Sequence, residues 1–136
     1  MNGQKFALAA AGVFVTMMAT GFVVHGLLLG SDYQALGSTM MRGEADSMAH
    51  LPFNALAHLC MALGIVWIYA QGVESKPWLG QGLRFGAAFW LIGSLGVYLI
   101  YFSVQPMPAA LAAKQIGYGL PESLLMGVVV SALYRK

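Results

Sequence analysis

The chain has 136 residues, of which 59% are hydrophobic and only 9% carry a formal charge. Soluble domains contain about 25% charged residues, so most of the surface that a soluble protein presents to water is missing here. The length favours one compact unit, and a net charge of +2 is too small and dispersed for a nucleic-acid-binding protein. The single cysteine, Cys60, excludes an internal disulfide and any cysteine-based metal motif. This composition is typical of an integral membrane protein.

Four long apolar runs make up most of the chain. They cover residues 6–30, 51–72, 85–104 and 116–134, and only the fourth contains an acid, Glu122. Each run has roughly the 20 residues that an α-helix needs to cross about 30 Å of hydrocarbon. The runs lack the alternation of membrane strands, and the first is too long for the apolar part of a signal peptide, so we expect it to be retained. The sequence therefore predicts an all-α fold, a single domain forming an antiparallel four-helix bundle in the membrane.

Polar segments rich in helix breakers separate the runs. Residues 72–84 (GVESKPWLGQGLR) and 105–114 (QPMPAALAAK) are predicted to be turns. Residues 31–49 form the longest connection. Its second half, residues 42–50, is predicted to make a short surface helix that leads into Pro52.

The basic residues of the connections predict how the bundle is oriented. Five fall on the side of the chain termini: Lys5, Lys76, Arg84, Arg135 and Lys136. Two fall on the other side: Arg42 and Lys114. Because the side richer in Lys and Arg normally stays in the cytoplasm, we expect both termini to be cytoplasmic. The expected location is a bacterial inner membrane or its equivalent.

Small residues mark two predicted packing faces. Around the third run, four glycines fall within a narrow arc of a helix: Gly82, Gly86, Gly93 and Gly96. Such spacing lets two helix backbones approach closely, and we expect this face to pack against another span of the chain, with a homodimer contact as the alternative. On the first run, Thr16 and Thr20 lie on a similar face and are predicted to pack there, with hydroxyls bonded to carbonyls of their own helix or across to another helix.

Hydrogen-bonding side chains gather toward the outer end of the predicted bundle. They are expected to line an outward-opening polar cavity: His25, Asn54, His58, Tyr98, Tyr101, Gln105 and Glu122. Three titratable residues, His25, His58 and Glu122, fall at nearly the same depth on three different runs. A mid-helix acid costs roughly 2.5–3.5 kcal/mol to place in the membrane, so such residues normally face the bundle interior. Pro121 beside Glu122 also predicts a bend, as in the broken helices of transporter sites.

Structural explanations compete with a binding site at each of these positions. Glu122 would pair with Lys114, or with His58 in a bond that fixes the helix register. The tyrosines, Tyr98 and Tyr101, also fit an aromatic belt at the membrane surface.

Three functions remain open. The first is non-enzymatic binding or passage of a small ligand. The second is an accessory subunit of a larger membrane complex, or a homodimer, without ligand chemistry. The third is binding of a metal or haem b, with His25, His58 and Glu122 as candidate ligands. Enzyme chemistry has the least support, because the chain contains no Ser-His-Asp order, Walker loop, dinucleotide-binding glycine pattern or HExxH motif, and no cofactor is identified.

A family resemblance adds to the fold prediction. In chain order, GFVVHGLLLG, an Asn and a His early in the second run, KPWLGQGLRFG, VYLIYFSVQPMP and KQI resemble a set of small bacterial four-span membrane proteins of unknown function. The resemblance covers most of the chain and concerns segments that pack in the membrane. It implies a four-helix integral membrane fold, and it transfers no activity, cofactor or functional residue.

Overall fold

The computed structural model describes residues 2–37 and 41–135, and this part of the chain is helical without any strand. In chain order the helices are α1 (Gly3–Gly21), η1 (Phe22–Leu28), α2 (Gly30–Ala35), α3 (Glu44–Ala49), α4 (Leu51–Gly72), α5 (Trp78–Trp90), η2 (Leu91–Gly96), α6 (Val97–Val104) and α7 (Ala109–Leu133). η1 and η2 are π-helices that continue α1 and α5. α3 confirms the predicted surface helix, whereas α2 was not predicted.

Four helical stretches are long and apolar enough to cross a membrane, as predicted. They are Gly3–Leu28, Leu51–Gly72, Trp78–Val104 and Ala109–Leu133. Many large apolar side chains on them point outward: Ile92, for example, is 75% exposed and Phe53 69% exposed. Outward-facing apolar side chains on every span are what a lipid environment requires.

The third and fourth spans begin earlier than predicted. Each helix starts directly after a proline, Pro77 before α5 and Pro108 before α7. The fixed φ of proline and its missing N–H suit the start of a helix, and they disrupt a helix interior. The predicted spans began only after a basic residue, Arg84 or Lys114. A helix can include such a residue near its end, because the long side chain carries its charge to the membrane surface.

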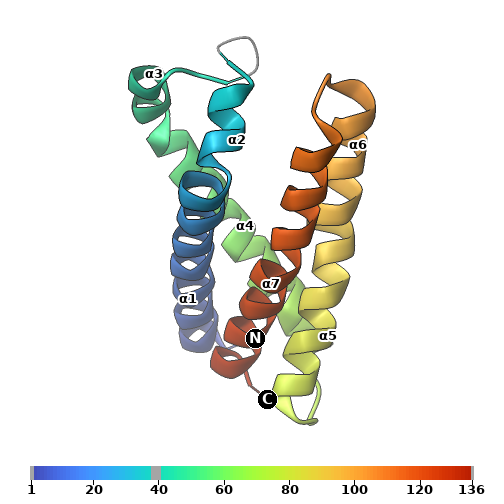
Figure 1. Ribbon diagram of the computed structural model, residues 1–136. Helices are drawn as coiled ribbons and strands as arrows, with labels where there is room; N and C mark the ends of the chain where they lie inside the picture. The colour runs from blue at the N-terminus through green and yellow to red at the C-terminus, as the bar shows by residue number, and fades with distance from the viewer. Residues whose placement is uncertain (1, 38–40, 136) are drawn as a thin grey trace.

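The two chain ends meet at one end of the bundle (Figure 1). There Nζ of Lys5 donates to the backbone oxygen of Arg135 at 2.9 Å. We call this the termini end, and we call the opposite end, which carries α2 and α3, the α2 end. Lys136, which entered the orientation argument, lies outside the described residues.

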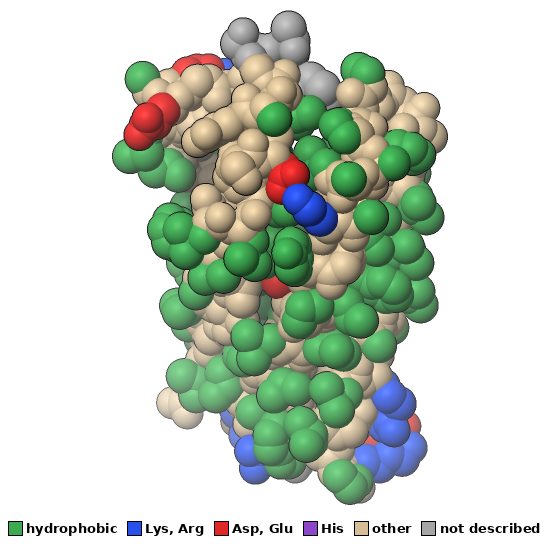
Figure 2. Space-filling view, in the orientation of Figure 1, with side chains coloured by type: hydrophobic (Ala, Val, Ile, Leu, Met, Phe, Trp, Pro, Cys, Tyr) green, Lys and Arg blue, Asp and Glu red, His purple; other side chains and the backbone are tan. Residues whose placement is uncertain are grey.

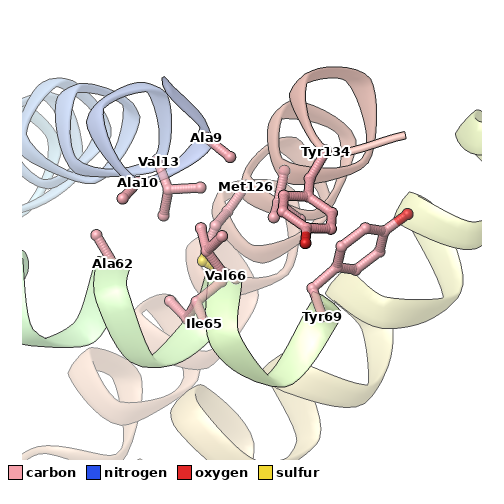
Figure 3. Packing of buried hydrophobic residues seen from close by; sticks show 10 residues of the cluster. Ala9, Ala10, Val13, Ala62, Ile65, Val66, Tyr69, Met126 and Tyr134 are labelled. Atoms are coloured by element: carbon pink, nitrogen blue, oxygen red, sulfur yellow. The ribbon is translucent and has the colours of Figure 1, made fainter. Parts of the chain in front are cut away.

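A large apolar core fills the half of the bundle nearer the termini end (Figure 3). Its buried members come from α1, α4, α7 and the residue after α7: Ala9, Ala10, Val13, Ala62, Ile65, Val66, Tyr69, Met126, Val130 and Tyr134. Phe85 of α5 joins this core edge-on to the Tyr69 ring, with ring centroids 5.2 Å apart.

Glycines bring α5 and α7 into backbone contact. A Cβ atom on Gly82 would lie 2.5 Å from the backbone oxygen of Gly127, and a Cβ on Gly86 would lie 2.9 Å from the Cα of Leu124. Real Cβ atoms do not approach other atoms this closely, so only glycine fits at either position. The face is therefore used within the chain. The other two glycines of the predicted arc, Gly93 and Gly96, face atoms of their own span instead, and Gly93 lines a cavity.

A second, smaller apolar cluster closes the α2 end. Val24, Leu29 and Leu111 are its buried members, and Tyr33 and Leu36 from the region of α2 pack against them. α2 thus folds back over η1 and the first turns of α7. The two apolar clusters leave a polar region between them, inside the bundle.

Candidate ligand-binding site

A cavity of about 180 Å³ occupies the space between the two apolar clusters. All four spans contribute to its walls. Its polar lining consists of Thr16, Thr20, His25, His58, Ser94, Tyr98, Glu122 and Ser123. Met17, Met61 and Phe89 are among the apolar residues that complete it.

Four of the seven predicted pocket residues line this cavity. They are His25 from η1, His58 from α4, Tyr98 from α6 and Glu122 from α7. Each is partly buried. The three titratable residues placed at one depth by the sequence argument therefore share one space.

The other three predicted residues lie elsewhere. Asn54, Tyr101 and Gln105 are exposed and do not line the cavity. Asn54 lies in the part of α4 nearer the α2 end, where the obliquely running helix diverges from α6 and α7 (Figure 1). Tyr101 belongs to α6, as Tyr98 does, and Gln105 follows the end of that helix.

Two of the four spans are π-helical at the level of the cavity, and a proline interrupts the backbone hydrogen bonding of a third, which stays α-helical. His25 lies within η1, and Ser94 lies within η2. In α7, Pro121 precedes Glu122 and leaves the carbonyl of Gly117 without its usual N–H partner. π-helical turns are rare and occur often at functional sites, so their position here draws attention to the cavity.

A chain of hydrogen bonds connects His25 to α2 and α7. Nε2 of Gln115 donates to the Tyr33 hydroxyl oxygen at 3.1 Å, and this hydroxyl lies 2.6 Å from Nδ1 of His25. Burial raises the pKa of Tyr33, so its hydroxyl keeps its hydrogen and can both donate and accept. The sequence analysis did not connect Gln115 to Tyr33.

The tautomer of His58 follows from its hydrogen bond. Its Nδ1 lies 2.8 Å from the backbone oxygen of Asn54, and a carbonyl oxygen only accepts hydrogen bonds. Nδ1 must therefore carry the hydrogen, and Nε2 of the neutral ring holds a lone pair. Nε2 is also the His58 atom nearest to Gly21 of α1, 3.7 Å from where a Cβ would stand. The imidazole thus reaches across the cavity toward the first span.

Thr16 and Thr20 bond back to their own helix, one of the two predicted arrangements. Thr16 Oγ1 donates to the Gly12 oxygen at 2.8 Å, and Thr20 Oγ1 donates to the Thr16 oxygen at 2.9 Å. Because each hydroxyl already donates its only hydrogen, it can only accept a hydrogen bond from a group in the cavity. These residues pack the helix and also supply hydrogen-bond acceptors, a second role that the sequence argument missed.

Glu122 makes no hydrogen bond or ion pair with any residue in the described part of the chain. Lys114, one of its two predicted partners, instead binds Asp32 of α2 at 2.8 and 2.9 Å. The other, His58, is bonded to its own helix. A carboxylate inside a span is costly without a partner, so this group is left with unused capacity to bind a hydrogen-bond donor or a cation.

Metal and haem ligation receive no support from the geometry. Within the described residues, no three His, Cys, Asp or Glu side chains are grouped closely enough to hold a metal ion, although His25, His58 and Glu122 share the cavity. Haem is a large ligand, and pockets for drug-sized molecules occupy roughly 300–1,000 Å³. The 180 Å³ cavity is well below that range.

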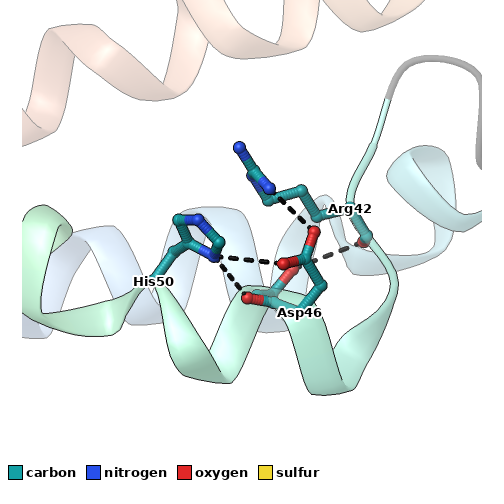
Figure 4. A network of polar contacts seen from close by, with 4 residues as sticks. Arg42, Asp46 and His50 are labelled. Carbon is teal, nitrogen blue, oxygen red and sulfur yellow. Dashed lines mark hydrogen bonds and ion pairs between the residues drawn. The ribbon is translucent and has the colours of Figure 1, made fainter.

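His50 belongs to the surface rather than to the cavity. Its Nδ1 donates to the backbone oxygen of Asp46 at 2.7 Å, and Asp46 also binds Nη1 of Arg42 at 2.8 Å (Figure 4). These contacts hold α3 against the start of α4. Of the two histidines near the start of α4, only His58 lines the cavity.

Residues of α2 and of the second apolar cluster lie at the α2 end of the cavity, where the sequence predicts an outward opening. Tyr33 and the second apolar cluster lie over His25, and the Asp32–Lys114 ion pair joins α2 to α7 beside them. The arrangement can enclose a small polar group among ionisable side chains from four helices. Comparisons with protein-family models, with curated proteins and with solved structures find no match for this chain.

Proposed function

We propose that this chain is a membrane protein that binds a small ligand in the cavity between its four spans, without enzymatic turnover. One observation carries the proposal: ionisable side chains from four separate helices line one cavity, at the level where two spans are π-helical and a third contains a proline. Both features cost stability in a membrane helix, and neither is needed to hold a bundle together. A binding site accounts for both.

The state of Glu122 distinguishes a binding site from a structural contact. A carboxylate retained to fix helix register would be paired with a partner on a neighbouring helix. Glu122 has no such partner among the described residues, although Lys114 lies on the same helix and pairs elsewhere. A ligand that binds the carboxylate supplies the missing partner.

The homodimer contact predicted at the glycine face is not supported. Gly82 and Gly86 are buried against α7, so this glycine face is not available to another protein. The exposed apolar side chains of the spans are accounted for by lipid.

The proposed orientation places both termini in the cytoplasm, in an antiparallel bundle of a bacterial inner membrane. Its support is the gathering of Lys5, Lys76, Arg84 and Arg135 at the termini end, where blue side chains also cluster in Figure 2. Basic residues near the ends of spans favour the cytoplasmic side.

Native mass spectrometry of the protein released from nanodiscs tests the binding proposal. We expect a reproducible added mass that is lost in Glu122→Gln, which removes the charge and keeps the shape of the side chain. Glu44→Gln in the surface helix α3 is the matched control and should retain the mass. Bare protein, or lipid adducts unaffected by Glu122→Gln, would show that the polar cluster has only a structural role.

A further inference from the structure

A second space lies against the outside of the cavity. It is an apolar groove of about 310 Å³ between α1–η1 and α7. Val23, Val24 and Leu28 form one wall, and Pro121 and Leu125 form the other. Val23, Leu28 and Leu125 are largely exposed, so in a membrane the groove faces the hydrocarbon chains of the lipids.

Thr20 and Glu122 line both the cavity and the groove. The two spaces therefore meet at the carboxylate of Glu122. Figure 2 shows acidic atoms at mid-height on the face between α1 and α7, surrounded by uncharged side chains. Since residues of α2 and of the second apolar cluster lie at the α2 end of the cavity, the groove gives a lateral approach to Glu122 from the bilayer.

The hydrogen-bonding groups around the carboxylate indicate what it binds. Thr16, Thr20 and Glu122 can only accept hydrogen bonds from a ligand, because the two hydroxyls already donate their hydrogens within α1. Nε2 of the neutral His58 ring also accepts, because the ring hydrogen is on Nδ1. The remaining polar groups can donate or accept: His25, Ser94, Tyr98 and Ser123. An excess of acceptors beside a carboxylate favours a ligand that donates several hydrogen bonds and carries positive charge, as an ammonium group does.

We propose that the ligand is an amphipathic ammonium compound, whose charged head binds Glu122 where cavity and groove meet and whose apolar chain lies in the groove between η1 and α7. Such a molecule dissolves in the bilayer and reaches the site sideways, without passing the α2 end. The inference rests on the proposed function, because it names the ligand class of the same site. It also assigns a role to the groove, which the cavity alone does not require.

Binding of n-decylamine to the protein in zwitterionic nanodiscs tests the charge of the head. Its amine is protonated at neutral pH, like that of lysine. Removing one partner of a desolvated charge pair costs at least about thirty-fold in affinity, so Glu122→Gln should weaken binding by that factor or more. Glu44→Gln should leave the affinity unchanged. Decanol, which has the same chain without the charge, should bind no better to the wild type than to Glu122→Gln.

A substitution in the groove tests the path of the chain. Ala19 lines the groove and is exposed, so Ala19→Phe places a ring where the ligand chain would lie. We expect it to weaken n-decylamine binding about tenfold and to leave methylammonium, which has no chain, unaffected. Ala11→Phe is the control, because Ala11 is also exposed on α1 and does not line the groove.

The outcomes separate the two proposals. Equal n-decylamine affinity in wild type and Glu122→Gln would overturn the assignment of an ammonium head to Glu122. Equal n-decylamine affinity in Ala19→Phe and Ala11→Phe would show that the chain of the ligand does not lie in the groove. If n-decylamine fails to bind while a Glu122-dependent mass is still found by native mass spectrometry, the inference is wrong and the proposed function stands. If neither n-decylamine binding nor a Glu122-dependent mass is found, the cavity is not a ligand-binding site.

Discussion

The hydroxyl of Tyr33 on α2 lies 2.6 Å from Nδ1 of His25 in η1, so a helix outside the spans is bonded to the π-helical turn inside them. The same hydroxyl accepts a hydrogen bond from Gln115 of α7 at 3.1 Å. Three elements therefore meet at one oxygen atom, and α2 depends on that atom for its position over the cavity.

Replacing Tyr33 by Phe tests this dependence. The change leaves His25 Nδ1 and Gln115 Nε2 without partners, and an unsatisfied buried polar group costs about 1–3 kcal/mol. We expect a loss of that size in the free energy of unfolding in detergent, together with faster amide hydrogen exchange in α2. Tyr101→Phe is the control, since Tyr101 is exposed on α6. Identical stability of the two variants would contradict the role assigned to the Tyr33 hydroxyl.

The ionisation of Tyr33 gives a pH dependence with a defined sign. Burial raises its pKa above the ordinary tyrosine value of about 10, so the folded state favours the neutral hydroxyl. The bond to His25 is then fully present below pH 10 and is lost as the pH rises through the elevated pKa. A tyrosinate absorbance titration of wild type minus Tyr33→Phe should show one tyrosine ionising above pH 10. Ionisation of that tyrosine below pH 10 would contradict the burial argument.

Two neighbouring glycines of α5 provide a matched pair. A Cβ on Gly82 would meet the backbone of α7, whereas a Cβ on Gly80 would meet no atom within 4 Å. Gly82→Ala should therefore separate α5 from α7 and lower the free energy of unfolding by about 1–3 kcal/mol. Gly80→Ala should leave it unchanged or raise it by up to about 1 kcal/mol, because alanine favours helices. Melting temperatures that shift equally for both variants would argue against close α5–α7 packing.

The buried side chain of Gln81 holds the connection between α4 and α5. Its Oε1 accepts from Glu74 N at 2.9 Å, and its Nε2 donates to the backbone oxygens of Glu74 and Lys76 at 2.9 and 2.8 Å. Gln81→Leu removes all three bonds, and at about 1 kcal/mol each we expect a loss of roughly 3 kcal/mol. Hydrogen exchange at the Glu74 amide should accelerate. Gln71→Leu, at an exposed position of α4, is the control and should not change that rate. Unchanged exchange at the Glu74 amide in Gln81→Leu would show that the Gln81 hydrogen bonds do not hold this connection.

Reporter fusions test the orientation. An enzyme that is active only outside the cytoplasm should give no signal when it is fused to the C-terminus. The same enzyme inserted after Gly43, in the connection at the α2 end, should be active. The reverse pattern would place the termini outside and would invert the proposed topology.

The depth of polar residues could be predicted from the sequence, because membrane thickness fixes where a residue lies along an apolar span. That is why His25, His58 and Glu122, predicted at one level, line one cavity. The direction in which a side chain points around its helix was harder to predict from the sequence. Membrane spans are apolar on all sides, so no polar face indicates rotation, and the exposed position of Tyr101 was missed for this reason.

Two other features had no sequence signal. A π-helical turn has the same composition as the α-helix around it, so η1 and η2 were not foreseen, nor was the position of Ser94 in the cavity wall. The contact between Tyr33 and Gln115 joins residues that are 82 positions apart. Such a pair becomes apparent only after α2 has folded back over the bundle.

The close glycine contact between α5 and α7 has a mechanical consequence. α5 packs closely against α7 through its glycines, and α1 packs against both α4 and α7. At the α2 end, α2 is joined to η1 and α7 by one ion pair, two hydrogen bonds and the second apolar cluster (Figure 1). None of these contacts at the α2 end is as close as the backbone contact between α5 and α7. We therefore expect ligands of different width to shift α2, while the contact between α5 and α7 keeps its geometry.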